Sequence, residues 1–186
     1  MPTARELAEE LFRGFDPTDD GVGVLVETFN RAEASRLKAE RERLRVAFHE
    51  AGHAVAGHYL GGRVQYVAVR ENGSGETRFD WSHITPRPLA CQGVAAYAGL
   101  MAEEHFRRGA NRRGSIRDFA LIEQLTEQVA DRRTSAMDWR WKWRDDARQL
   151  VAKHAAKIEA VAYEIYDRGS LIGSEVIECI ARSDGR

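Results

Sequence analysis

Residues 45–57 constrain this chain more than any other segment, because they place ionisable side chains inside an apolar, helix-forming run. The segment reads RVAFHEAGHAVAG and contains the pattern H-E-x-x-H at His49, Glu50 and His53. Residues four positions apart lie on the same face of an α-helix, so the two imidazoles project together. Valine, alanine and phenylalanine surround them, which predicts a buried helix. Buried histidines need a polar partner, and one metal ion satisfies both.

The same pattern is typical of zinc hydrolases, in which two histidines bind Zn²⁺ and the glutamate takes a proton from metal-bound water. It therefore predicts His49 and His53 as zinc ligands, Glu50 as the general base, and hydrolysis of peptide bonds. A catalytic zinc needs a third protein ligand and keeps its fourth position for water. The extended pattern with a third histidine six positions after the second is excluded, because His58 follows His53 by five.

Three downstream carboxylates are candidates for the third ligand: Glu103, Glu104 and Asp118. The two glutamates lie near the end of a predicted helix, where either could instead accept a hydrogen bond from a ligand histidine. Asp118 lies three residues after Ser115, a spacing that also fits a capping box at a helix start. From the residues alone, these alternatives stay open.

Composition limits the other functions of the chain. Its 186 residues, 43% of them hydrophobic and 31% charged, suffice for one domain with a core or for a domain with a helical extension. A net charge of −1 gives no electrostatic case for nucleic acid. We expect neither a membrane span nor a signal peptide, and hence a cytoplasmic location. Cys91 and Cys179 are predicted to be small core residues in a reducing compartment.

The hydrophobic pattern predicts a mainly α (α+β) fold with one β-hairpin and a long C-terminal helix. A short helix from Thr3 precedes one from Val24 to about Arg45, whose later half has a solvated, charged face. The remaining predicted elements are the signature helix ending at Gly61-Gly62, strands 64–69 and 77–81, a small-residue helix 89–108, a glycine-containing loop 108–114, a helix 116–130 capped by Ser115, a helix 135–168 ended by Gly169, and a terminal helix capped by Ser174.

Trp139, Trp141 and Trp143 alternate along the predicted helix 135–168. A spacing of two spreads side chains around a helix, so the three residues do not form one aromatic stripe. We expect packing against the amino-terminal helices for some of them, with a core or interface role overall.

Four ordered segments together resemble the peptidase domain of the FtsH-type ATP-dependent zinc proteases. They read VAFHEAGHAV at 46–55, AGLMAEE at 98–104, GSIRD at 114–118 and LIGSEV at 171–176. The resemblance spans about residues 45–180 and implies a helical, zincin-like metallopeptidase domain at 45–186, after a helical extension at 1–44. It also implies that His49, His53 and Asp118 bind zinc and that Glu50 is the general base.

The chain departs from that family in several places. It contains no G-x-x-x-x-G-K-[ST] loop, so we expect no ATP binding by that route. Gly99-Leu-Met-Ala-Glu-Glu replaces the family's G-R-A-A-E-E, and Ser115 lies one residue further from Asp118 than usual. The hypothesis is ATP-independent, zinc-dependent cleavage of polypeptides, with strand 77–81 as an edge that pairs with the substrate.

A second hypothesis from another class is a catalytically silent, zinc-stabilised binding or regulatory module, with the tryptophans as a docking surface. The presence of Glu50 argues against it, because metal binding and helix stability do not need this residue. A third is a helical domain without metal. A second copy of the chain or a separate protein remains open as a partner.

Overall fold

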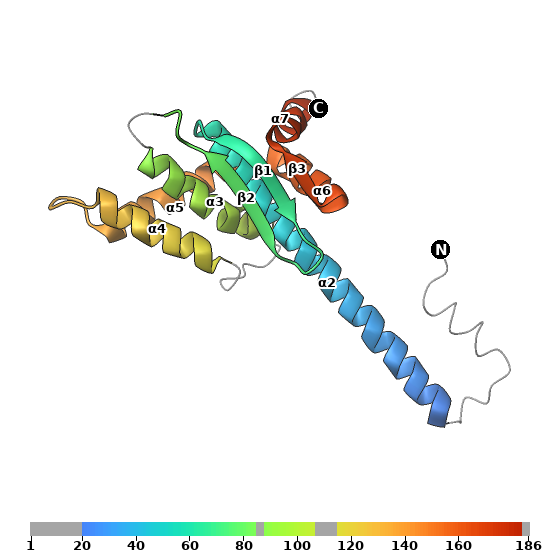
Figure 1. Cartoon of the computed structure of the whole chain (residues 1–186). Helices are drawn as coiled ribbons and strands as arrows, with labels where there is room; N and C mark the ends of the chain where they lie inside the picture. Colours follow the sequence, from blue (N-terminus) through green and yellow to red (C-terminus); the bar gives the residue numbers. More distant parts are fainter. Residues whose placement is uncertain (1–19, 85–87, 107–114, 184–186) are drawn as a thin grey trace. The chain divides into compact units, whose positions relative to one another are not determined.

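The computed structural model describes residues 20–84, 88–106 and 115–183. It is mainly helical with one small antiparallel sheet, which confirms the predicted fold class (Figure 1). The described elements are α2 (Asp20–Tyr59), β1 (Arg63–Val69), β2 (Gly75–Asp80), α3 (Leu89–His105), α4 (Ile116–Val129), α5 (Ala136–Lys153), α6 (Ala155–Arg168), β3 (Ser170–Ile172) and α7 (Gly173–Ser183). The predicted helix from Thr3 and the predicted loop 108–114 lie outside the described residues.

The chain divides into two compact units, residues 1–42 and 43–186. Helix α2 contributes to both, because the two predicted helices around Arg45 form one continuous helix of 40 residues. In the first unit, its side chains from Glu27 to Arg41 are mostly exposed, in keeping with their dense charge. None of the described helices combines the length and the hydropathy that a bilayer span requires.

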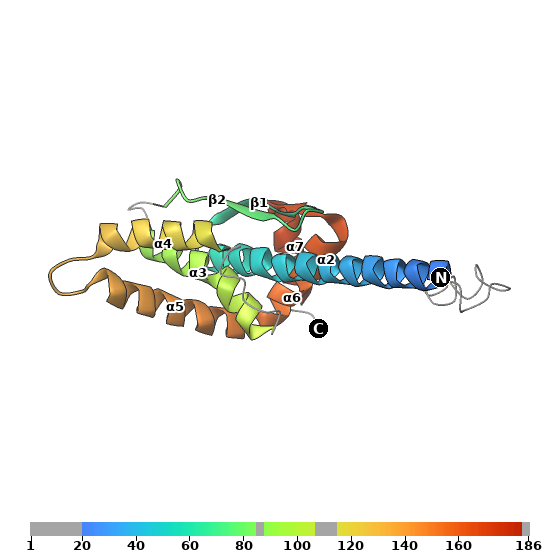
Figure 2. The same ribbon diagram turned by 90° about the horizontal axis from the view of Figure 1, so that it is seen from below.

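The second unit is built around the apolar end of α2. The sheet lies along this segment, while α3, α4 and α5 flank it on one side and α6 and α7 on the other (Figures 1 and 2). Helix α3 approaches α2 closely: a Cβ added to Gly52 would lie 2.6 Å from the carbonyl oxygen of Ala98 and 2.7 Å from the Cβ of Ala102. The small residues of both helices therefore permit the contact that their sequence predicts.

The sheet has the strand order β2-β1-β3, and both pairings are antiparallel. The β1–β2 pair confirms the predicted hairpin, with Val67 opposite Thr77. Strand β3 was not predicted, since its three residues are too few for an alternating pattern and it pairs with a strand about 100 residues earlier. Because β1 lies in the middle, β2 is an edge strand of this sheet.

The prediction of one helix from Ser135 to Arg168 is wrong. The chain leaves helical geometry at His154, with φ −112° and ψ 24°, and α5 and α6 are separate helices. The imidazole of His154 stacks on the Tyr59 ring at 3.8 Å between centroids, a contact that sequence periodicity cannot reveal. Gly169 ends α6 at a positive φ of 81°, as expected. The terminal helix begins at Gly173, so Ser174 lies inside it and not at its cap.

The three alternating tryptophans have different surroundings. Trp143 is 1% exposed and packs against α3, where a Cβ on Gly93 would overlap its ring. Trp139 is half-buried beside it, with ring centroids 5.9 Å apart, whereas Trp141 is 62% exposed. The predicted core role holds for Trp143, which packs against α3.

We expect Trp143→Ala to lower the free energy of unfolding by about 3–5 kcal/mol, because it leaves a large cavity between α3 and α5. Trp141→Ala is the matched control on the same helix and should change it by less than about 0.5 kcal/mol. Urea unfolding followed by far-UV circular dichroism measures both. Equal effects of the two substitutions would contradict this account of the core.

Candidate metal centre

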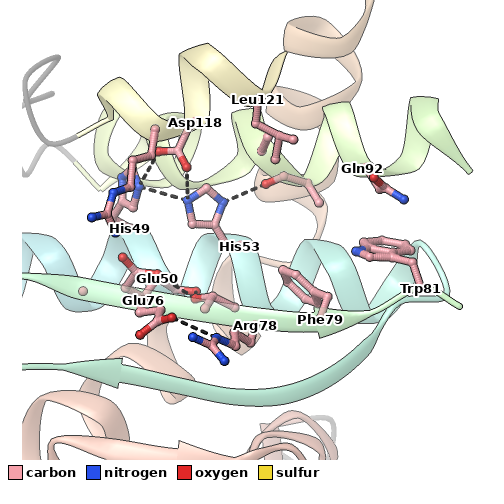
Figure 3. Close-up of a pocket in the computed structure, with 15 residues that line it drawn as sticks. His49, Glu50, His53, Glu76, Arg78, Phe79, Trp81, Gln92, Asp118 and Leu121 are labelled. Carbon is pink, nitrogen blue, oxygen red and sulfur yellow. Dashed lines mark hydrogen bonds and ion pairs between the residues drawn. The ribbon is translucent and has the colours of Figure 1, made fainter. Parts of the chain in front are cut away.

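Three side chains from two helices meet in the second unit. The buried face of α2 presents His49 and His53, and the first turn of α4 presents Asp118 (Figure 3). The Nε2 atoms of the two histidines lie 2.9 Å apart, and Asp118 lies 3.1 Å from His49 Nε2 and 3.5 Å from His53 Nε2. We refer to these residues as the triad. Among the described residues, they form the cluster whose donor atoms could hold a metal ion.

The spacing of the triad fits a tetrahedral zinc site. Zinc bonds of about 2.0–2.2 Å at tetrahedral angles put neighbouring donor atoms about 3.3–3.6 Å apart. The observed separations lie close to that value: 2.9 Å between the two Nε2 atoms, 3.1 Å from His49 Nε2 to Asp118 Oδ2, and 3.5 Å from His53 Nε2 to Asp118 Oδ1. Two imidazole nitrogens and one carboxylate oxygen are also a donor set that zinc commonly uses at catalytic sites.

Hydrogen bonds fix which nitrogen of each histidine faces the triad. His53 Nδ1 lies 2.8 Å from the carbonyl oxygen of Ala95, and His49 Nδ1 lies 2.8 Å from Glu103 Oε1. Carbonyl and carboxylate oxygens can only accept, so both Nδ1 atoms carry the hydrogen. Both Nε2 lone pairs then point at the same small space, and two facing lone pairs need a cation between them.

The charges around the triad also favour a cation. Burial opposes a charge on His49, but hydrogen bonds to Asp118 and Glu103 outweigh it and raise the pKa of His49 to about 10. Burial opposes a charge on His53 too, yet Asp118 raises its pKa. The pKa of Asp118 is lowered despite burial, because His53 and His49 stabilise the carboxylate. Protons and a metal ion therefore compete for the same electron pairs.

The structure gives a different position to each of the three carboxylates that the sequence offered as the third ligand. Asp118 reaches the histidines, and the Ser115 side chain makes no capping bond at the start of α4. Glu103 is fully buried and binds His49 on the nitrogen that faces away from the triad, while Arg45 donates to the same carboxylate. Glu104 pairs with Arg144 at 3.4 Å on the outside of α3.

Glycine leaves the space in which a cation would lie. A Cβ on Gly99 of α3 would lie 2.5 Å from His53 Nε2 and 2.8 Å from His49 Nε2. Any larger residue would therefore enter the space between the donor atoms. The sequence showed Gly99 only as one small residue among several in this helix, and gave no signal that it faces the histidines.

Glu50 is held beside the triad by the edge strand. The hydroxyl of Thr77 donates to Glu50 Oε2 at 2.7 Å, and a Cβ on Gly75 would lie 2.4 Å from Glu50 Oε1. Sequence reasoning placed Thr77 on a strand but did not identify this contact, because strand and helix are brought together only by the fold.

An open cleft of about 400 Å³ gives access to these residues. Strand β2 forms one wall, and α3 and α4 form the opposite side (Figure 3). The residues that line it include the triad, Glu50, residues 75–79 of β2, Trp81, Ala95, Ala96, Arg117 and Leu121.

Comparison with known proteins supports a metallopeptidase. Residues 35–100 match the family model described as Peptidase M50B-like. The match covers His49, Glu50 and His53 and ends before Asp118, and it supports a zinc metallopeptidase family without singling out the FtsH type. No curated protein gave a match to the chain.

We expect Glu103→Gln to weaken zinc binding about 10–100-fold, because an amide is a poorer acceptor for the Nδ1 hydrogen of His49. Glu104→Gln, one residue later and on the outside of α3, should leave it unchanged. Competition with a chromogenic chelator measures the affinity, and thermal unfolding of the metal-free proteins checks their folding. Equal affinities for Glu103→Gln and wild type would mean that Glu103 does not orient His49.

We expect Gly99→Ala to abolish the stabilisation of the protein by zinc while all three donor residues remain. Zinc at 100 times its dissociation constant should stabilise the wild type by about 2.7 kcal/mol. The added methyl group blocks the space between the donors, but alanine is a better helix former than glycine, so the metal-free variant should still fold. A zinc-dependent rise of Tm as large as that of the wild type would contradict this placement.

Proposed function

We propose that this chain is a zinc-dependent endopeptidase, with His49, His53 and Asp118 as metal ligands and Glu50 as the general base. The observation that carries the proposal is a set of three donors, both imidazoles oriented by hydrogen bonds, at the side of an open cleft that also contains Glu50. Structural zinc sites are commonly closed by four protein ligands, whereas catalytic sites keep one position open.

When bound, zinc supplies Lewis-acid polarisation and lowers the pKa of water. The chain itself supplies proton transfer. Thr77 donates to Glu50 Oε2 and so fixes the orientation of this carboxylate. Glu50 accepts the proton of the attacking water and delivers it to the nitrogen of the leaving amine, so the carboxylate returns to its starting state. Glu103, paired with Arg45, keeps His49 in the tautomer that can bind metal.

The edge of β2 supports a polypeptide as the substrate. The amide of Arg70 donates to the carbonyl of Ser74, so the main-chain groups of Ser74 point toward the β1 side of the hairpin. By alternation, the main-chain groups of Gly75, Thr77 and Phe79 then point away from β1, toward the side that is open for another strand. An extended peptide that pairs there would pass beside Glu50, since Gly75 and Thr77 both contact that residue.

Within the metallopeptidases, we propose the FtsH-type arrangement for the ligands. Its support is the ordered set of motifs, in which an A-E-E segment precedes a loop and an aspartate that starts the next helix. The position of Asp118 at the two Nε2 atoms agrees with that order. The silent-module hypothesis has less support, because a purely structural site needs neither Glu50 nor an open cleft.

We expect Glu50→Gln to lower zinc-dependent cleavage of casein about 10²–10⁴-fold while the protein keeps one zinc per chain. Asp118→Ala should lower both metal content and cleavage, because it removes a ligand. Glu71→Gln, in the exposed hairpin turn, is the control and should change neither. Elemental analysis and fluorescent-casein degradation measure the two properties in parallel.

Undiminished cleavage by Glu50→Gln with zinc still bound would contradict the role of Glu50. Loss of metal from His53→Ala but not from Asp118→Ala would contradict the assigned third ligand.

A further inference from the structure

The cleft continues beyond the triad into an apolar part that the proposed chemistry does not use. Phe79 and Trp81 follow Thr77 along one wall, and Leu121 of α4 lies on the opposite side (Figure 3). We refer to Phe79, Trp81 and Leu121 as the apolar lobe. A second cavity of about 530 Å³, near the end of β2, shares Phe79 and Trp81 with the cleft.

The two aromatic rings of the lobe are fixed by close contacts with glycine. A Cβ on Gly57 would lie 2.2 Å from the Phe79 ring, and one on Gly62 would lie 2.7 Å from the Trp81 ring. The rings also contact one another, with centroids 5.5 Å apart. Because the side chains are already ordered, a ligand that binds between them incurs little additional loss of conformational entropy.

Leu121 belongs to the cleft and not to the core. It is 39% exposed, whereas its neighbour Ile122 is buried in the core of the second unit. Leu121 follows Asp118 by three positions on α4, and residues at this spacing share one face of a helix. The face that supplies the third donor therefore also presents an exposed leucine to the same cleft.

The course of β2 sets the direction of a peptide across this lobe. The strand runs from Gly75, beside Glu50, to Phe79, beside Gly57. Both existing pairings of the sheet are antiparallel, and this pairing is the more stable per residue. An added antiparallel strand would thus have its amino-terminal part at Phe79 and its carboxyl-terminal part at Gly75. The residue opposite Phe79 would point its side chain to the same face as Phe79.

We propose that the apolar lobe is a specificity site for a bulky apolar or aromatic side chain on the amino-terminal side of the scissile bond. The identity of this occupant rests on the proposed peptidase function. Phe79 and Trp81 provide a rigid aromatic wall, and Leu121 closes the site from α4. The chain would therefore select extended segments that carry exposed hydrophobic residues, such as those of unfolded proteins.

Binding to a cleavage-deficient protein tests the lobe without catalysis. The probes are two fluorescein-labelled decapeptides of alanine, serine and threonine, one with a single phenylalanine and one with serine at that position. We expect zinc-loaded Glu50→Gln protein to bind the phenylalanine peptide about tenfold more tightly, as measured by fluorescence anisotropy. Equal affinities would overturn the proposal.

Introducing a charged residue into the apolar lobe tests whether the preference for phenylalanine arises there. In the Glu50→Gln background, Leu121→Glu should remove the tenfold difference in affinity between the phenylalanine and serine peptides. It should also bind a third peptide, with lysine at the variable position, more tightly than the other two. Misfolding cannot produce such a gain in affinity. Ile177→Glu on α7 is the matched control, because Ile177 is also an exposed aliphatic residue, at 48%. It should keep the phenylalanine preference. A preference that survives Leu121→Glu would overturn the proposal.

The positions at which the wild type cleaves peptides show the direction in which the peptide binds. Mass spectrometry of a digested peptide library should show apolar residues enriched at one position before the cut, and Leu121→Glu should shift that position alone toward lysine and arginine. Enrichment only after the cut would overturn the proposed direction. A phenylalanine preference in binding, without zinc-dependent cleavage by the wild type, would refute the proposed function and leave the lobe as a side-chain site.

Discussion

The arrangement of two imidazoles with their Nε2 atoms 2.9 Å apart governs the second unit. Each Nδ1 donates to an oxygen, so the two Nε2 atoms face one another, and the pair needs a cation, either a proton or a metal ion, and a counter-charge. Helix α3 supplies Glu103 and the carbonyl of Ala95 as hydrogen-bond acceptors for the two histidines, and its Gly99 leaves room for the cation. Helix α4 supplies Asp118 as the counter-charge. Three helices must therefore keep their mutual positions for the site to exist.

In the proposed peptidase, the chemistry and the selection of substrate come from different elements of the fold. The proposed proton transfer and metal binding depend on the buried face of α2, whereas the cleft wall is formed by the edge strand β2 and the exposed face of α4. Thr77 joins the two parts, because it lies on β2 and holds Glu50. An arrangement of this kind permits substrate selectivity to change through exposed residues without disturbing the ligands.

Sequence reasoning and family comparison cover different parts of the chain. The match to the Peptidase M50B-like model ends at residue 100, so it bears on the H-E-x-x-H segment and not on Asp118. The geometry brings Asp118 to the two histidines and takes Glu104 away from them. The strand β3 was missed for a related reason, because it pairs with a strand distant in sequence and leaves no local pattern. The break at His154 was missed too, and this residue stacks on Tyr59, which is also distant in sequence.

By itself, the sequence determined most of the local elements and which face of the signature helix carries the two histidines. Helical periodicity places His49 and His53 together, apolar neighbours bury them, and glycine-rich turns separate the strands of the hairpin. Only the tertiary structure decided which carboxylate completes the triad, which one orients His49, and what holds Glu50. The physical reason is that these contacts join residues 27 to 69 positions apart, whose meeting is fixed by helix and sheet packing and not by local spacing.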